Sequence, residues 1–355
     1  MKIATKVSKN KKMISETVNH YDHYIALDWS LDNVTVARMR ASSSQPKVIK
    51  LDSDIRLVKE YSNKYHGNTI LCLEETTGSH WLYVELKDYF DKIFVCDPYR
   101  NRLLSEGAKT DKIDAVKLCQ LLRAGLLKEV YHSLDADYHL RKIVSAYEDW
   151  VKFGVRFKNQ KSALYRAIGL QHKNDCIDES KELLKFIESH QESAINLYEE
   201  RKKEYEQLFR SLRRQNRLIS NLTAISGINN ISAVTIYSKV IDASRFENKY
   251  KYWSYCGLVK HEKQSGGRSY GKRSPRYCRK LKSIYKTASL AAIGGKNDIR
   301  DYYDYLLSLG ISTRDARNGV ARYIAKVSYG MLKNKSKYIP YQWRISQEKK
   351  TIEIT

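Results

Sequence analysis

The strongest constraint on the fold comes from residues 138–222, which hold no proline and only two glycines, Gly154 and Gly169. Apolar residues recur there at helical spacing, and dense charges lie between them. The pattern predicts a helical coiled-coil stalk, or a long helical hairpin, over residues 136–220. An internal helical bundle and a partner helix from another subunit explain its apolar side equally well, because a narrow charged stalk buries little surface alone.

Residues 22–135 carry a different pattern, in which short apolar strands alternate with helices. In chain order they predict a hairpin, a crossover helix, a strand, a helix and a strand, which is typical of a mixed sheet with helices on its faces. One more helix is expected from Asp111 to Ala124, with Thr110 as its N-cap and Gly125 just past its end. The first region is therefore α/β.

Residues 221–340 are punctuated by glycines and predict a small, mainly helical domain with loops. Residues 1–21 are expected to form a basic N-terminal arm, and residues 341–355 a loosely held tail. The fold class of the whole chain is thus α/β plus α.

The charge of the chain points to a polyanionic partner. It has 64 Lys and Arg residues against 40 Asp and Glu, which gives a formal net charge of +24. A basic bias that only aids solubility is the plainer alternative. Apolar runs are too short to cross a bilayer and no secretory apolar core is visible, so we expect a cytoplasmic, nucleoid-associated protein with no membrane partner.

Carboxylates stand where rigid elements end. Asp28 follows an apolar strand, Glu74 and Glu75 follow another, and Asp111 and Asp114 share one face of a helix start. Such oxygen-rich side chains on three elements are suited to two divalent ions. Acidic residues in a first helical turn also simply suit the helix dipole. Strand alternation from the preceding leucines does not settle which of the two glutamates points inward.

The segment 258–286 is strongly basic and contains a serine followed by two glycines. It carries ten Lys or Arg residues, one acidic residue, and interleaved tyrosines, a composition suited to nucleic-acid backbones and stacked bases. Ser265 lies before Gly266 and Gly267, so a phosphate can approach its hydroxyl closely, although local chemistry alone favours a polar turn. The cations expected to neutralise phosphates are Arg268, Lys272, Arg273, Arg276 and Arg279.

Residues 222–230 link two short helical patterns. The stretch is similar to the hairpin of a helix-hairpin-helix element, whose backbone amides hold DNA phosphates. Asn229 stands at the usual second glycine, and asparagine tolerates a left-handed backbone. A plain helix-loop-helix core is the alternative.

In their order and spacing, these motifs resemble the IS110 family of insertion-sequence transposases and the related Piv-type DNA invertases, from about residue 22 to 335. IALDWS contains Asp28, and EETTGSHW is similar to a Glu-Ala-Thr-Gly-x-x-Trp pattern that assigns the family glutamate to Glu75. AKTDKIDAVKLCQLL matches a Lys-Thr-Asp-x-x-Asp-Ala element with Asp111 and Asp114. LTAISGINNISA, SRFENKYKYWSYCGL and QSG are similar to the C-terminal domain, with the family serine at Ser265.

The resemblance implies a RuvC-like ribonuclease-H catalytic domain at 22–135, a coiled-coil stalk at 136–220 and a C-terminal transposase domain at 221–340 that bears the catalytic serine. It implies a DEDD tetrad holding Mg²⁺, with Mn²⁺ as a possible substitute, and recombination through a phosphoserine intermediate. Donor and target double-stranded DNA, a structured non-coding bridge RNA, and homodimers that assemble into tetramers are the implied partners.

Two other functions fit the same residues. A Holliday-junction-type, structure-selective endonuclease would use the carboxylates with a metal-activated water, and Ser265 would be only a turn residue. A catalytically silent nucleic-acid-binding protein would use the basic surface alone, although all four carboxylates are retained. A covalent protein–DNA adduct separates the first reading from both.

Overall fold

The computed structural model describes residues 21–99, 110–133, 135–171 and 174–344. The chain divides into two compact units, residues 1–138 and 139–355, and each is described by itself. The expected basic arm, apart from Tyr21, lies outside the described residues, as does the tail from residue 345. The regions expected as stalk and C-terminal domain belong mainly to the second unit.

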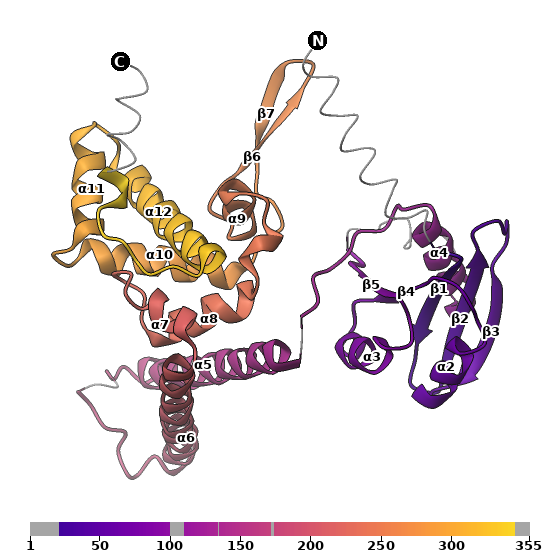
Figure 1. The fold of residues 1–355 in the computed structure, drawn as a ribbon. Helices are drawn as coiled ribbons and strands as arrows, with labels where there is room; N and C mark the ends of the chain where they lie inside the picture. Colours follow the sequence, from indigo (N-terminus) through magenta and orange to yellow (C-terminus); the bar gives the residue numbers. More distant parts are fainter. Residues whose placement is uncertain (1–20, 100–109, 134, 172–173, 345–355) are drawn as a thin grey trace, which may run out of the picture. The chain divides into compact units, whose positions relative to one another are not determined.

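The first unit is built on a mixed five-stranded sheet with the order β3-β2-β1-β4-β5 (Figure 1). β1 pairs antiparallel with β2, and β2 antiparallel with β3, whereas β4 runs parallel to both β1 and β5. This arrangement is compatible with the expected ribonuclease-H-like fold. The strands are β1 (His23–Trp29), β2 (Asn33–Arg40), β3 (Lys47–Asp52), β4 (Thr69–Glu74) and β5 (Lys92–Cys96).

Helices pack against both faces of this sheet, as the sequence predicts. One apolar cluster joins the strands to α2 (Ile55–Ser62) and α3 (Ser79–Leu86), and a second joins them to α4 (Asp111–Arg123). The predicted cap of α4 is confirmed, because the Thr110 side chain accepts a hydrogen bond from the backbone N–H of Ile113. α4 therefore begins at a fixed residue next to the sheet.

Two long helices follow, α5 (Asp135–Ala167) and α6 (Glu182–Gln215), and they pack on each other within one chain. The Tyr147 and Phe209 rings meet edge-on with centroids 5.2 Å apart. A Cβ added to Gly154 would lie 2.3 Å from the Tyr198 ring, so this glycine permits the close approach of the helices. Lys158 forms an ion pair with Glu199. Coiled-coil pairing with another subunit stays a prediction.

The rest of the second unit is a helical domain around one apolar core. Its central helix is α12, which packs against α7, α9, α10 and α11. Among the described helices, none is long and apolar enough to cross a membrane. The helices are α7 (Arg217–Leu222), α8 (Asn230–Val240), the 3₁₀ turn η2 (Ala243–Arg245), α9 (Lys249–Tyr255), α10 (Arg279–Ile293), α11 (Asp298–Ser308) and α12 (Thr313–Asn334).

The turn between α7 and α8 differs from expectation at Asn229. This residue is extended, with φ −86° and ψ 177°, and its side chain caps α8 by accepting from the Ser232 N–H. The left-handed residue is Gly227, at φ +89°, and a Cβ there would lie 2.2 Å from the carbonyl oxygen of Ala288. The glycine is thus required both by its backbone conformation and by its contact with α10.

Replacing Gly227 with alanine is expected to destabilise the second unit by about 3 kcal/mol, since the left-handed conformation costs roughly 1–2 kcal/mol and the clash with backbone adds to it. Urea denaturation gives the free energy of unfolding. Gly310 is the matched control, because it has φ +76° and open space around the added Cβ. If Gly227→Ala and Gly310→Ala lower the free energy of unfolding equally, the contact with Ala288 does not contribute to stability.

Candidate active site

Asp28 and Glu74 lie side by side at one edge of the sheet. β1 and β4 are parallel and pair Leu27 with Leu73. The next residue along each strand is Asp28 on β1 and Glu74 on β4. Since parallel strands keep their register, these two carboxylates are neighbours at the carboxyl ends of adjacent strands. The edge formed by these strand ends is where ligands bind in open α/β sheets.

The pleat directs both side chains toward the face that α4 covers. Tyr24 and Ala26 of β1 pack in the cluster that contains α4, and so does Cys72 of β4. Side chains alternate along a strand, so two residues further on, Asp28 and Glu74 share that face. The start of α4 carries the remaining carboxylates of the predicted set, which therefore gather on one side of the sheet.

Asp111 and Asp114 stand in the first turn of α4. Asp111 is exposed and Asp114 is half-buried. The buried Oδ1 atom of Asp114 has no hydrogen-bond partner. A buried oxygen without a donor costs free energy, and a bound cation is one way to satisfy it. The structure thus brings the helix pair predicted from sequence to the same face as Asp28.

Electrostatics connects the four carboxylates. The pKa of Asp28 is raised from its usual value of 3.8 to about 6. Burial is the largest cause, and the negative charges of Asp111, Glu74 and Asp114 contribute the rest in decreasing order. A carboxyl whose pKa is raised by three others experiences their charge directly. The four groups therefore form one acidic cluster rather than independent surface acids.

The acidic cluster has the donor chemistry that a divalent ion requires. Hard cations such as Mg²⁺ prefer carboxylate oxygens, and the orphaned Asp114 oxygen and the repelled Asp28 carboxyl both gain from a positive charge. Within the described ranges, no group of three His, Cys, Asp or Glu side chains is close enough together to hold a metal ion. Closer approach of like charges needs a cation between them.

Glu75, the glutamate that motif similarity selects, lies just after β4. Its backbone N–H donates to the carbonyl oxygen of Cys96, so strand pairing continues through this residue. Alternation then directs its side chain away from the face of Asp28, and Glu75 is not among the groups that shift the pKa of Asp28. Strand alternation left Glu74 open as the alternative, and the face that it shares with Asp28 favours it. The assignment of the ligand to Glu75 by motif similarity stays a prediction.

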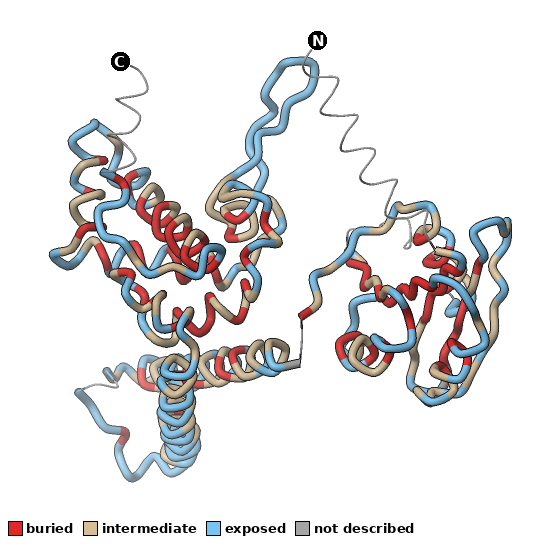
Figure 2. Tube along the Cα trace, in the orientation of Figure 1, coloured by how far each residue is buried: buried red, intermediate tan, exposed pale blue. Residues whose placement is uncertain are grey.

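Ser265 lies at the tip of an exposed two-stranded arm, where the sequence predicted only a turn or loop. The arm consists of β6 (His261–Ser265) and β7 (Arg268–Arg273), joined by Gly266 and Gly267. Both glycines have positive φ, as a two-residue hairpin turn of type I′ requires. Every residue of the two strands is exposed (Figure 2). The Gly-Gly pair between two short runs was the available hairpin signal.

The predicted phosphate-binding cations follow the serine along this arm. Arg268 pairs directly with Ser265 across the hairpin, so both side chains lie on the same face. Lys272 and Arg273 are exposed on β7, Arg276 follows the strand, and Arg279 begins α10. An exposed hydroxyl next to a guanidinium can contact a phosphodiester while the guanidinium neutralises the phosphate charge.

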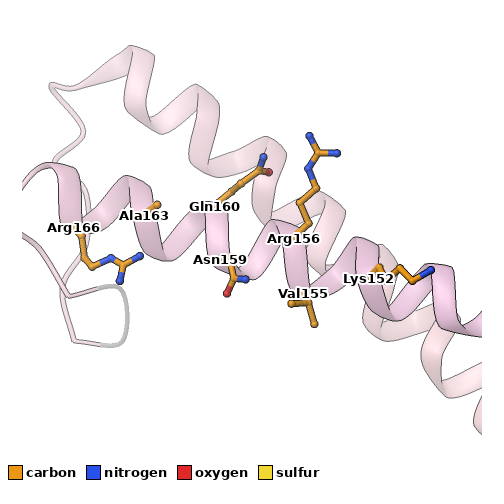
Figure 3. A pocket seen from close by; sticks show the side chains of 7 residues that line it. All are labelled: Lys152, Val155, Arg156, Asn159, Gln160, Ala163 and Arg166. Carbon is orange, nitrogen blue, oxygen red and sulfur yellow. The ribbon is translucent and has the colours of Figure 1, made fainter. Parts of the chain in front are cut away.

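A second basic surface runs along α5. It is a shallow, open surface formed by exposed residues at helical spacing, three of them cationic (Figure 3). Cations, amides and small apolar residues on one open helix face suit a nucleic-acid backbone. The lining residues are Lys152, Val155, Arg156, Asn159, Gln160, Ala163 and Arg166.

Comparison with known proteins gives two family matches. A model for DEDD transposases of the IS110 type matches residues 25–169. A model described as the transposase IS116/IS110/IS902 family matches residues 219–304. The first match contains all the carboxylates of the acidic cluster and the second contains Ser265 and its arm. A search of curated proteins returned no match.

Proposed function

Because this chain belongs to the IS110 family of transposases, we propose that it cuts and rejoins DNA at specific sites of an insertion sequence through a phosphoserine intermediate. It is a DNA transposase, and the DEDD family to which it belongs normally uses a divalent metal. The observation that carries the proposal is the geometry of the acidic cluster. Asp28 and Glu74 lie at the carboxyl ends of adjacent parallel strands on the face that α4 covers, and the first turn of α4 carries Asp111 and Asp114.

In this proposal Asp28, Asp111 and Asp114 hold Mg²⁺, or Mn²⁺ in its place, together with one glutamate of the Glu74–Glu75 pair. Bound there, the metal would neutralise charge on the reacting phosphate. Asp28 and the glutamate supply oxygens from rigid strands, and α4 supplies two from its first turn. Holding the ligands on regular elements fixes where a phosphate can bind.

Ser265 acts as the nucleophile. Its Oγ forms a bond to the scissile phosphorus while the bond from phosphorus to the leaving sugar oxygen breaks, so one phosphodiester replaces another. The hydroxyl proton is lost to solvent, and the leaving sugar oxygen takes up a proton from solvent. The energy of the DNA bond is kept for rejoining, and no external energy source is needed. Arg268 lies across the hairpin from the serine and neutralises the attacked phosphate. Lys272, Arg273, Arg276 and Arg279 hold neighbouring phosphates of the strand.

A structured bridge RNA guides this reaction to donor and target DNA, and homodimers assemble into tetramers in which serine and carboxylates act together. Support for the nucleic-acid partners comes from the net charge of +24 and from the basic faces of the arm and α5. Co-purification tests the RNA: nucleic acid extracted from the protein is treated with ribonuclease or deoxyribonuclease and sequenced. If active protein yields no RNA of defined sequence, the proposal of a guide RNA is wrong.

Strand exchange with purified protein tests the reaction itself. Labelled DNA carrying the ends of the element is incubated with protein, bridge RNA and Mg²⁺, then resolved on a denaturing gel. A labelled band at the mass of the protein marks the covalent intermediate. Cleavage without an adduct would instead mean a nuclease that uses water, and binding without any cleavage a silent DNA-binding protein.

Glu74→Gln is expected to reduce strand cleavage on the order of 10³-fold, because the isosteric amide keeps the shape but removes a charged oxygen ligand. Glu75→Gln is its matched control one residue away and is expected to stay within a few fold of the unaltered protein. Single-turnover cleavage in Mg²⁺ measures both. The reverse ranking would assign the ligand to Glu75, as the motif similarity does.

A further inference from the structure

The helical domain of the second unit contains a cavity of about 450 Å³, which the acidic cluster and the serine arm do not share. It lies between the start of α9, the second half of α12 and the segment that follows α12. Val327, Tyr329 and Met331 form a buried floor. At the rim, the Tyr250 side chain is 61% exposed and Ile339 is 53% exposed. The volume falls in the range typical of small-ligand sites.

Positive charge surrounds this apolar floor. The lining contains four lysines, Lys249, Lys326, Lys333 and Lys337, and a single acidic residue, Glu247. In the part of the chain that the structure describes, no carboxylate forms an ion pair with Lys249, Lys333 or Lys337. A ligand that fits must therefore be anionic at one end.

Aromatic groups hold two of these cations in position. The Lys249 Nζ atom lies 5.1 Å from the centre of the Tyr250 ring, and the Lys333 Nζ atom donates to the Tyr329 hydroxyl at 3.0 Å. The first amides of α9 contribute little, because the Asn248 side chain already accepts from the N–H groups of Tyr250 and Lys251. The lysines thus supply the attraction for an anion, and the exposed Tyr250 ring supplies a flat surface beside them.

We propose that this cavity binds one unpaired nucleotide of a single-stranded nucleic acid. The phosphate contacts the lysines, and the base stacks on Tyr250 and covers Ile339. Every base can stack on an aromatic ring, since each has a π face. The site therefore binds a single strand without sequence specificity. The proposal rests on the proposed function only in that the protein handles nucleic acid; it does not require strand cleavage.

Photocrosslinking locates the nucleotide directly. Full-length protein is irradiated with ten-nucleotide single strands that carry 5-iodouracil, one of RNA and one of DNA, and the crosslinked residue is mapped by mass spectrometry. We expect a crosslink at Tyr250 that persists in Ser265→Ala. A crosslink with RNA alone assigns the site to a guide strand, and one with DNA alone assigns it to an unpaired DNA strand. Crosslinks confined to the serine arm would overturn the proposal.

Affinity gives a second measurement. Lys333→Glu with Lys337→Glu is expected to weaken single-strand binding about tenfold. It should also flatten the plot of log affinity against log salt by about 0.7, because the contact with one phosphate is lost. Lys181→Glu with Lys296→Glu makes the same charge change at exposed lysines outside the cavity and should change neither quantity as much. Equal effects of the two pairs would mean that only overall charge matters.

Tyr250 tests the stacking half of the site. Tyr250→Phe keeps a ring and is expected to bind as the unaltered protein does, whereas Tyr250→Ala should lose about tenfold in affinity. Thermal unfolding confirms that both variants are folded. If strand exchange proceeds but Tyr250→Ala binds normally, the cavity proposal fails and the proposed function stands. If Ser265→Ala exchanges strands while the Tyr250 crosslink persists, the serine mechanism fails and the cavity proposal stands.

Discussion

Ser265→Ala is expected to lower strand exchange by at least about 10⁴-fold and to remove the covalent protein–DNA adduct, because no other group on the tip of the arm can form the phosphoester. Folding should be unaffected, since the serine is exposed and the hairpin turn depends on Gly266 and Gly267. The measurement is the adduct band and the exchanged product on one denaturing gel, with DNA binding followed separately by anisotropy.

Ser269→Ala is the matched control, because Ser269 is an exposed serine on the same arm and lies on β7 opposite Gln264. It should keep both adduct and product. A Ser265→Ala protein that still cuts DNA without an adduct would identify water as the nucleophile and a nuclease as the enzyme. Unchanged adduct formation would transfer the nucleophilic role to another residue.

Asp114→Asn is expected to slow cleavage on the order of 10³-fold in Mg²⁺. This corresponds to an activation free energy that is about 4 kcal/mol higher. We expect Mg²⁺ to raise the melting temperature of the unaltered protein, and Asp114→Asn should abolish that rise, because the charge that draws a cation to the orphaned oxygen is gone. The metal-free variant is expected to be slightly more stable, since one of the charges that raise the pKa of Asp28 is removed.

Thermal unfolding with and without Mg²⁺, alongside single-turnover cleavage, measures all three effects. Asp88→Asn removes an exposed carboxylate of the same unit outside the acidic cluster and should leave the metal response intact. An Asp114→Asn protein that still gains full stability from Mg²⁺ would exclude Asp114 as a ligand. If Asp114→Asn cleaves DNA at the full rate but its melting temperature no longer responds to Mg²⁺, the metal bound at Asp114 is not needed for catalysis.

Local signals in the sequence predict much of the first unit. The helix α4, with its threonine cap and the glycine just past it, follows from residues within one turn of each other. Strand β3 was missed, because none of its residues is buried and its alternation is weak. The proximity of Asp28 and Glu74 could not be read from sequence either, since it depends on the register of two strands that lie far apart along the chain.

In the second unit, too, local features could be predicted from the sequence, whereas contacts between distant segments could not. Helical spacing predicts α5 and α6, but it takes contacts between them, such as that of Gly154 with Tyr198, to show that the two helices pair within one chain. The exposed arm gave almost no apolar signal, because neither of its strands has an inner face. The lysine-lined cavity combines residues 247–250 with residues 326–342, and no local motif brings such segments together.

The absence of buried residues from β6 and β7 makes the arm separable from the rest of the fold. A segment that contributes nothing to the packed interior can change its charges with little loss of folding stability. If the arm contacts DNA as we propose, residues 261–273 can therefore be exchanged as one unit without disturbing the scaffold.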